Sequence, residues 1–384
     1  MKIKKEGCCG SPFCKEDEKM KPVGIYIHVP FCASKCPYCD FYSFCGSENE
    51  KNAYTDALVR EITKYKGRNI EADTVYFGGG TPSLLGKENL CRVLDAVKDS
   101  FCVPDSAEIT LEANPGDELY GLFCAVREKG VNRLSMGAQS GVDSELKALG
   151  RRHTRAQTAA AVNEARRAGI DNISLDLMLA IPDQTAATLR ESIDFITSLS
   201  PNHVSAYLLK IEENTPFGKN PPVVPDDDAA ADLYELAVER LDAAGYEQYE
   251  ISNFAKKGFE SRHNTKYWHD EEYIGFGAGA HSFFEGKRFY YPRSASDYIK
   301  GIEPVPDGTG GSEEEYVMLR LRLSEGITES AWMERFGTKI PEKYRKNAES
   351  LIKAGLAECD ENGIRLTKRG FLLSNPAILT IIGE

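Results

Sequence analysis

The 384-residue sequence lacks a long hydrophobic run and has no excess of positive charge. A membrane-spanning helix needs about 20 consecutive apolar residues, and no stretch approaches that length, so no membrane span is expected. The formal net charge of -12 argues against sequence-independent binding to nucleic acid, which depends on clustered lysine and arginine. The start of the chain is basic but lacks the apolar segment of a secretory signal. We therefore expect a cytoplasmic protein.

The chain has 11 cysteines but does not look like a disulfide-bonded secreted protein. Disulfide frameworks are typical of small secreted chains, whereas a long acidic chain without a signal uses cysteine for metals or as free thiols. Cys32, Cys36 and Cys39 have the spacing C-x3-C-x2-C. A structural zinc site takes four ligands, usually in two pairs, whereas three cysteines on a 4Fe-4S cluster leave one iron open. The spacing favours a cluster over zinc or incidental thiols.

Hydrophobic periodicity predicts an α/β fold for residues 22–255. We predict six strands, separated by segments of helical spacing, at residues 23–29, 72–79, 107–114, 132–139, 172–180 and 203–210. This alternation predicts a parallel sheet, curved into a partial (βα)6 barrel. Ligands of such folds bind at the carboxyl ends of the strands. The cysteines, the segment GGGTP (78–82) and several polar residues lie at or near these ends, which predicts one site there.

The pattern changes after residue 255. Residues 256–311 form a glycine- and aromatic-rich connecting segment that contains HNTKYW (263–268) and GFGAGAHSF (275–283). Residues 312–384 show three helical segments and then a hairpin around Asn362-Gly363, which predicts a small winged-helix-like domain. Its basic and acidic residues are nearly balanced, so a DNA-binding basic face is not expected.

The first 21 residues are expected to form a flexible N-terminal extension, because their composition is polar. Three cysteines lie within it, Cys8, Cys9 and Cys14. A further metal site is the alternative that these cysteines leave open.

The cysteine spacing, with the aromatic residue Tyr38 before the last cysteine, resembles the motif of the radical SAM superfamily. GGGTP resembles that family's second signature, where the absence of side chains allows close approach of the backbone to a ligand. The resemblance implies a 4Fe-4S cluster whose open iron binds S-adenosylmethionine (SAM). It also implies that an electron from the cluster can cleave SAM to a 5′-deoxyadenosyl radical.

Further segments resemble, in order, the oxygen-independent coproporphyrinogen oxidase group. They are YIHVPFC (26–32), GGGTPS (78–83), LEANPG (111–116), RLSMGAQS (133–140), ALGRRHT (148–154) and DLMLAIPDQT (176–185). The resemblance implicates two sets of residues, Tyr26, Gly79 and Glu112 around cluster-bound SAM, and Tyr38, Gly80, Thr81, Gln139, Arg151 and Asp176 around a second SAM. Chemically, the two carboxylates can accept hydrogen bonds from ribose hydroxyls or an amino group, and Arg151 can pair with a carboxylate. Taken singly, Gln139 and Asp176 would be interpreted as strand-end residues bonded to backbone.

Two departures from the oxidases match a sister group, the heme chaperones. The oxidases carry another cysteine two residues after the third cluster ligand, where this chain has Phe41, and they have a longer leader. HNTKYW matches the chaperone pattern H-N-x-x-Y-W. A neutral imidazole is a good axial ligand for heme iron, and aromatic rings pack on a porphyrin face. The predicted heme-binding residues are His263, Asn264, Tyr267, Trp268 and His281; His281 and His28 are rivals to His263 as the axial ligand.

The resemblance leaves three functions open. The first is a heme chaperone that binds a 4Fe-4S cluster, SAM and heme and delivers heme to respiratory hemoproteins, with possible peripheral membrane association and a possible homodimer bridged through the open iron. The second is coproporphyrinogen III dehydrogenase, in which a deoxyadenosyl radical abstracts hydrogen from each propionate before carbon dioxide is lost. The third is another radical reaction on a tetrapyrrole, such as methylation. Phe41 and the short leader favour the chaperone, and whether SAM is ever cleaved stays open.

Overall fold

The computed structural model describes residues 22–116 and 119–383. It confirms the six predicted strands, which are β1 (Val23–Val29), β2 (Ala72–Gly79), β3 (Glu108–Ala113), β4 (Arg133–Gln139), β5 (Asn172–Leu179) and β6 (His203–Leu208). Each strand pairs in parallel with the next. The predicted α/β core with its parallel sheet is therefore confirmed. The extension with Cys8, Cys9 and Cys14 lies outside the described residues.

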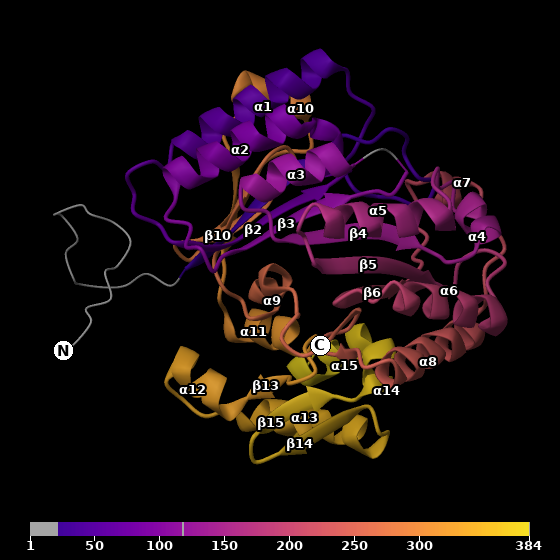
Figure 1. The fold of residues 1–384 in the computed structure, drawn as a ribbon. Coiled ribbons are helices and arrows are strands. Elements are labelled where there is room, and N and C mark those ends of the chain that lie inside the picture. Colours follow the sequence, from indigo (N-terminus) through magenta and orange to yellow (C-terminus); the bar gives the residue numbers. More distant parts are fainter. Residues whose placement is uncertain (1–21, 117–118, 384) are drawn as a thin grey trace, which may run out of the picture.

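Helices cover the outer face of the sheet (Figure 1), and the first six of them connect the six strands. They are α1 (Glu48–Thr63), α2 (Lys87–Ser100), α3 (Tyr120–Glu128), α4 (Asp143–Ala148), α5 (Arg155–Arg167), α6 (Ala186–Ser198), α7 (Pro216–Lys219) and α8 (Asp227–Ala243), with a 3-10 turn at Pro82–Leu85. Ser47, Thr154 and Thr185 each accept a hydrogen bond from the backbone N–H three residues further on. These caps pair N–H groups that the start of a helix leaves without partners.

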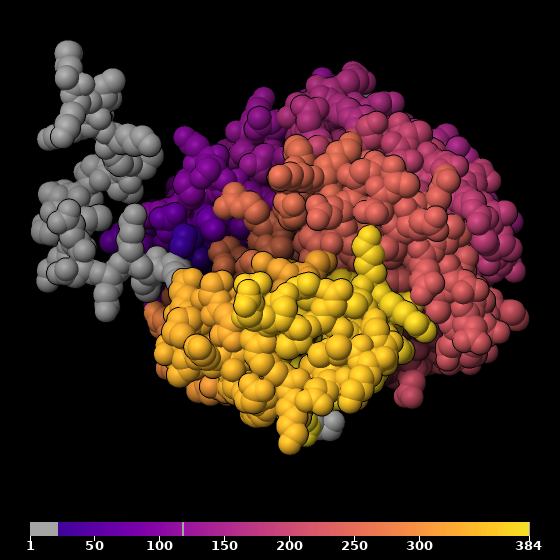
Figure 2. Space-filling view, turned by 90° about the horizontal axis from the view of Figure 1, so that it is seen from below, coloured from indigo at the N-terminus to yellow at the C-terminus, as the bar shows by residue number. Residues whose placement is uncertain are grey.

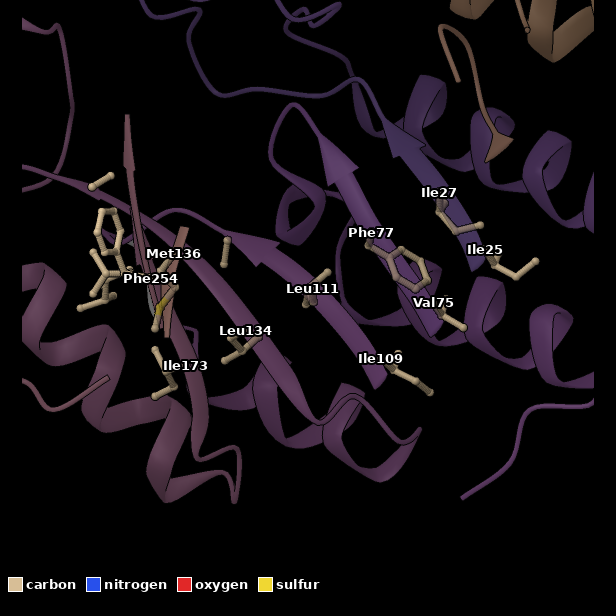
Figure 3. Packing of buried hydrophobic residues seen from close by; sticks show 14 of the residues in the cluster. Ile25, Ile27, Val75, Phe77, Ile109, Leu111, Leu134, Met136, Ile173 and Phe254 are labelled. Atoms are coloured by element: carbon tan, nitrogen blue, oxygen red, sulfur yellow. The ribbon is translucent and has the colours of Figure 1, made fainter. Parts of the chain in front are cut away.

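The two faces of the barrel strands differ in polarity. Figure 3 shows apolar side chains of neighbouring strands packed on one face, among them Ile25, Ile27, Val75, Phe77, Ile109, Leu111, Leu134 and Met136. Side chains alternate along a strand, so the residues between them point to the inside of the curved sheet. Those buried residues are largely polar and include Thr74, Thr110, Arg133, Ser174 and His203. The hydrophobic core thus lies under the helices, and the inside of the sheet is polar.

The connecting segment adds four strands to the main sheet, which the sequence did not predict. They are β9 (Tyr273–Phe276), β10 (His281–Phe284), β11 (Lys287–Tyr290) and β12 (Val305–Thr309). β9 pairs in parallel with β1, and the other three follow antiparallel. Because β9 runs parallel to β1, its end and the start of β10 lie at the rim that carries the cysteines. The segment also contains α9 (Arg262–Trp268) and α10 (Ala295–Lys300).

At the other edge of the sheet, β8 (Asn253–Ala255) pairs antiparallel with β6, and β7 (Glu247–Gln248) pairs with β8. Over the described residues the sheet has 12 strands in the order β12-β11-β10-β9-β1-β2-β3-β4-β5-β6-β8-β7. β9 continues the parallel arrangement of the six predicted strands, and antiparallel strands follow at both edges, so the predicted barrel is extended on both sides. We keep the predicted domain boundaries, at residue 256 for the connecting segment and at residue 312 for the C-terminal domain, as a proposal.

The C-terminal part has the predicted order of three helices followed by a hairpin. These elements are α11 (Glu313–Arg320), α12 (Glu329–Phe336), α13 (Glu342–Lys353), β14 (Ala357–Asp360) and β15 (Gly363–Leu366). The structure adds β13 (Ile327–Thr328), which pairs with β15, and then α14 (Lys368–Leu372) and α15 (Ser374–Ile382). Trp332 is fully buried and packs against Tyr316, Phe336 and Tyr344. Figure 2 shows this yellow part as a rounded body packed against the core.

Within residues 22–116 and 119–383, every helix is too short or too polar to span a bilayer.

Candidate functional site

The three cysteines lie on the loop that follows β1, at the carboxyl ends of the parallel strands. Backbone hydrogen bonds fix this loop, from Cys32 N to Phe44 O at 2.9 Å and from Cys39 N to Cys36 O at 3.1 Å. The three cysteines line a cavity of about 350 Å³. Burial raises the pKa of the Cys39 thiol, and the nearby Cys36 and Cys32 thiols raise it further. Three neighbouring thiols therefore line one cavity.

Glycines allow the segment after β2 to pack directly on the cysteine loop. Gly80 N donates to Val29 O at 2.9 Å, and a Cβ at Gly80 would lie 2.7 Å from the Phe31 carbonyl oxygen and 3.1 Å from the Cys32 Sγ. Gly79 has a φ of 114°, and a Cβ there would lie 2.6 Å from the His28 ring. Only residues without side chains fit these positions.

Two half-buried carboxylates line the same cavity, Glu112 from β3 and Asp176 from β5. Glu112 Oε1 accepts a hydrogen bond from the Tyr76 hydroxyl at 2.7 Å, and Asp176 Oδ1 accepts one from Ser135 Oγ at 3.3 Å. Burial raises the pKa of Glu112 to about 7 and that of Asp176 to about 6. A cation placed nearby would favour the ionised forms, so this end of the cavity suits a ligand with a sulfonium or ammonium group.

Arg151 lies between α4 and α5, and four acceptors fix its guanidinium. Nη2 donates to Asn114 Oδ1 at 2.5 Å and to Gly137 O at 2.8 Å. Nη1 lies 3.6 Å from Cys36 Sγ and 3.5 Å from the Tyr38 hydroxyl. The guanidinium thus joins the cysteine loop to the ends of β3 and β4.

All predicted cluster and SAM residues except Tyr26 line the cavity. Tyr26 instead lies within β1, where its hydroxyl is 3.0 Å from His28 Nδ1. Sequence reasoning missed Asn114, Tyr207 and His153, which also line the cavity. Asn114 directly follows β3 within LEANPG, and this strand-end position was the signal that could have identified it. The roles of the individual residues in SAM binding stay predictions.

HNTKYW forms α9, which lies at the opposite end of the strands from the cysteines, between the sheet and the C-terminal part (Figure 1). His263 is 1% exposed. Its Nδ1 lies 2.9 Å from Thr74 Oγ1 and its Nε2 lies 2.8 Å from the Tyr267 hydroxyl. Burial lowers the pKa of His263 to about 3. Both ring nitrogens are engaged, so His263 offers none to an iron in this arrangement.

The other residues of the motif also have packing partners. Asn264 N lies 3.4 Å from the capping hydroxyl of Ser261. The Tyr267 ring contacts the Tyr273 ring with centroids 4.6 Å apart. The Trp268 ring lies 5.6 Å from the guanidinium of Arg322, which follows α11. The motif thus closes the amino-terminal end of the barrel and contacts the C-terminal part.

His281 lies at the start of β10, on the cysteine rim. Its side chain is exposed and stacks on Tyr290, with ring centroids 5.1 Å apart and an interplanar angle of 22°. Within the described residues neither ring nitrogen of His281 has a hydrogen-bond partner. Partial burial lowers its pKa, which favours the neutral imidazole. The Arg293 guanidinium lies 4.0 Å from the Asp40 carboxylate, which connects this edge with the cysteine loop.

Comparison with known proteins agrees with this geometry. The radical SAM superfamily matches residues 26–196, and the HemN C-terminal domain matches residues 314–373. Coproporphyrinogen III oxidase (HemN) from Escherichia coli, a radical SAM enzyme, superimposes with a TM-score of 0.82 at 21% identity, covering 94% of this chain and 90% of that one. This likeness confirms the predicted fold. The fold and the cysteine-lined cavity define a radical SAM protein.

Sequence relatives show to which family of radical SAM proteins the chain belongs. The heme chaperone HemW of Bacillus subtilis is 36% identical over 94% of this chain and 99% of its own length. HemW of Escherichia coli is 36% identical, covering 95% and 100%, and HemW of Lactococcus lactis is 34% identical, covering 92% and 96%. The chain belongs to the heme chaperone HemW family, as its sequence predicted.

Proposed function

We propose that this chain is a heme chaperone, which binds heme and delivers it to heme-accepting respiratory proteins. The observation that carries the proposal is its similarity to HemW proteins, which extends over nearly the whole of both chains. The coproporphyrinogen oxidase of the same fold is only 21% identical. Phe41, which stands where the oxidases have a further cysteine, is 68% exposed at the mouth of the cavity. Dehydrogenation of coproporphyrinogen is therefore not favoured.

Cys32, Cys36 and Cys39 would hold the 4Fe-4S cluster, and the donor set fits it. A structural zinc site takes four ligands, usually in two pairs, whereas these three cysteines line one cavity. A 4Fe-4S cluster takes each thiolate at a different iron, so three cysteines can hold it and leave one iron open. When bound, the cluster supplies an electron and an open iron.

Residues facing the cysteines suit SAM. Glu112 and Asp176, both half-buried, would provide negative charge for its sulfonium and amino groups, and Gly79 and Gly80, which have no side chains, leave room beside the thiols. The cavity of about 350 Å³ falls within the range of small-molecule sites. We include a second SAM, which the resemblance to the oxidases implies, as part of this proposal.

For heme, the structural environment favours His281 over His263. The His281 side chain is exposed and stacked on Tyr290, and partial burial lowers its pKa. Arg293, 65% exposed in its side chain, offers a cation for a propionate. His263 would first have to break its hydrogen bonds to Thr74 and Tyr267. Asn264, Tyr267 and Trp268 then act in packing α9 rather than in contacting heme.

The test is a heme titration of the anaerobically reconstituted chain, followed by the Soret band, with a coproporphyrinogen assay in the presence of SAM and reductant. We expect tight heme uptake without protoporphyrinogen. His281→Ala should weaken uptake at least tenfold, whereas His263→Gln, the matched histidine substitution away from the rim, should not. Multiple-turnover conversion of coproporphyrinogen would refute the chaperone. If heme uptake is lost in His263→Gln but not in His281→Ala, the heme site is at α9 and not at His281.

The remaining proposals concern location and assembly. We propose that the chain acts in the cytoplasm, with peripheral association at the membrane where respiratory proteins receive heme. A homodimer bridged through the open iron is part of the proposal as well. Size-exclusion chromatography before and after cluster reconstitution tests it, because such a dimer must disappear when the cluster is removed.

A further inference from the structure

Two of the three cysteines are joined by a continuous series of side-chain contacts. Arg151 Nη1 lies 3.6 Å from Cys36 Sγ, and its Nη2 lies 2.5 Å from Asn114 Oδ1. Asn114 Nδ2 lies 2.7 Å from Thr81 Oγ1, which is 3.7 Å from Cys32 Sγ. The series thus runs from Cys36 through Arg151, Asn114 and Thr81 to Cys32.

The chemistry of the groups fixes the direction of each hydrogen bond. A guanidinium only donates, so Asn114 presents its carbonyl oxygen to Arg151 and its amide nitrogen to Thr81. Thr81 Oγ1 accepts from that nitrogen, which leaves its single hydrogen available for Cys32 Sγ. Asn114 therefore orients two donors at once, one toward each of two cluster-binding sulfurs.

We propose that this network, centred on Asn114, sets the reduction potential of the cluster through hydrogen bonds to Cys32 and Cys36. The inference rests on the proposed three-cysteine cluster and adds Asn114, Arg151 and Thr81 as positioning residues for it. Hydrogen bonds to the sulfurs and nearby charge are among the features that tune iron–sulfur potentials. Reduction adds an electron, so donors and a fixed cation beside the thiolates stabilise the reduced state and raise the potential.

Arginine suits this position because its planar fork serves several acceptors at once. Nη2 contacts Asn114 and Gly137 O, while Nη1 reaches Cys36. A lysine ammonium is a compact point charge and cannot reproduce that geometry. Space is restricted here too, because a Cβ at Gly137 would lie 2.9 Å from Asn114 Oδ1 and 3.0 Å from Arg151 Nη2.

The test is a redox titration of the reconstituted chain, followed by electron paramagnetic resonance, with iron and sulfide content determined for every sample. Arg151→Gln removes the donor to Cys36, and Thr81→Val removes the donor to Cys32 at nearly constant shape. Both should shift the midpoint potential to more negative values at unchanged cluster content. Arg151→Lys should restore only part of the shift. Arg152→Gln removes the same charge from the exposed neighbouring residue, which also lines the cavity. It is the matched control for charge without a hydrogen bond to a cysteine sulfur and should leave the potential nearly unchanged.

The outcomes separate this inference from the proposed function. Unchanged potentials in both Arg151→Gln and Thr81→Val, with full clusters, would overturn the network and leave heme binding untouched. An equal shift in Arg152→Gln would show that only net charge matters, which also overturns it. If Arg151→Gln binds no cluster, the midpoint potential of Thr81→Val alone tests the network. A wild-type chain that loads no cluster would overturn the cofactor assignment and this inference together.

Discussion

At the scale of single residues, burial of His263 makes its contribution to the free energy of unfolding depend on pH. Burial lowers the pKa of His263 to about 3, against about 6.5 in an unfolded chain. A lowered histidine pKa contributes stability that is fully present above about pH 6.5 and is lost as the pH falls toward 3, because the unfolded chain binds a proton that the folded chain does not. At about pH 5 this amounts to about 2 kcal/mol for His263.

We predict that His263→Gln is more destabilising at about pH 7.5 than at about pH 5, by about 2 kcal/mol, because glutamine escapes the cost of staying neutral in acid. Urea unfolding at the two pH values measures the difference. His269 provides a control of opposite sign. Burial alone would lower the pKa of His269, but its hydrogen bonds to the Glu271 and Glu325 carboxylates outweigh burial. The pKa of His269 is therefore raised. His269→Gln should therefore be more destabilising in acid, and the same pH trend in both variants would contradict the prediction.

The contact between the β2–α2 segment and the cysteine loop gives a prediction about local elements. A Cβ at Gly80 would lie only 2.7 Å from the Phe31 carbonyl oxygen and 3.1 Å from Cys32 Sγ, so Gly80→Ala must displace the loop that carries the thiols. We expect Gly80→Ala to bind several-fold less iron and sulfide after reconstitution. Gly121→Ala in α3, where a Cβ meets nothing within 4 Å, should load normally. Normal loading of Gly80→Ala would show that the loop adapts.

The sequence predicted the central elements well because their signals were strong. Apolar runs and intervening helical periodicity located β1 to β6, and the rule that ligands bind at carboxyl ends of parallel strands located the cavity. The sequence did not predict β9, β10 and β11, because each has only four residues. A run that short, among glycines, shows little hydrophobic periodicity. Their pairing depends on β1, which is more than 200 residues away in the chain.

Residue roles were less predictable than strand positions. HNTKYW identified His263 as a ligand because an imidazole among aromatic rings suits heme, yet the same composition suits a hydrogen-bonded histidine beside Thr74 and Tyr267. Only the tertiary structure shows that α9 lies at the end of the barrel away from the cysteines. The strand-end position of Asn114 could have placed it at the site, but only the structure shows its hydrogen bonds to Arg151 and Thr81.

For the whole molecule, ion pairs around the buried Asp270 carboxylate link the C-terminal part to the sheet. Asp270, which follows α9, has a fully buried side chain between Arg288 of β11 and Arg335 of α12. Arg335 Nη1 also lies 3.2 Å from the Asp270 carbonyl oxygen. One carboxylate therefore joins the added edge of the sheet to the winged-helix-like part, and its removal leaves two guanidinium groups without this partner.

We predict that Asp270→Asn destabilises the folded chain by about 3 kcal/mol, since breaking a buried ion pair leaves uncompensated charge. Amide hydrogen exchange should quicken in α12 and β11 more than in the central strands, because the two parts separate there first. The control is Glu314→Gln, which removes an exposed carboxylate 3.9 Å from Lys343 and should change stability by less than about 1 kcal/mol. Equal losses in the two variants, or exchange that rises uniformly over the sheet, would mean that apolar packing and not Asp270 holds the two parts together.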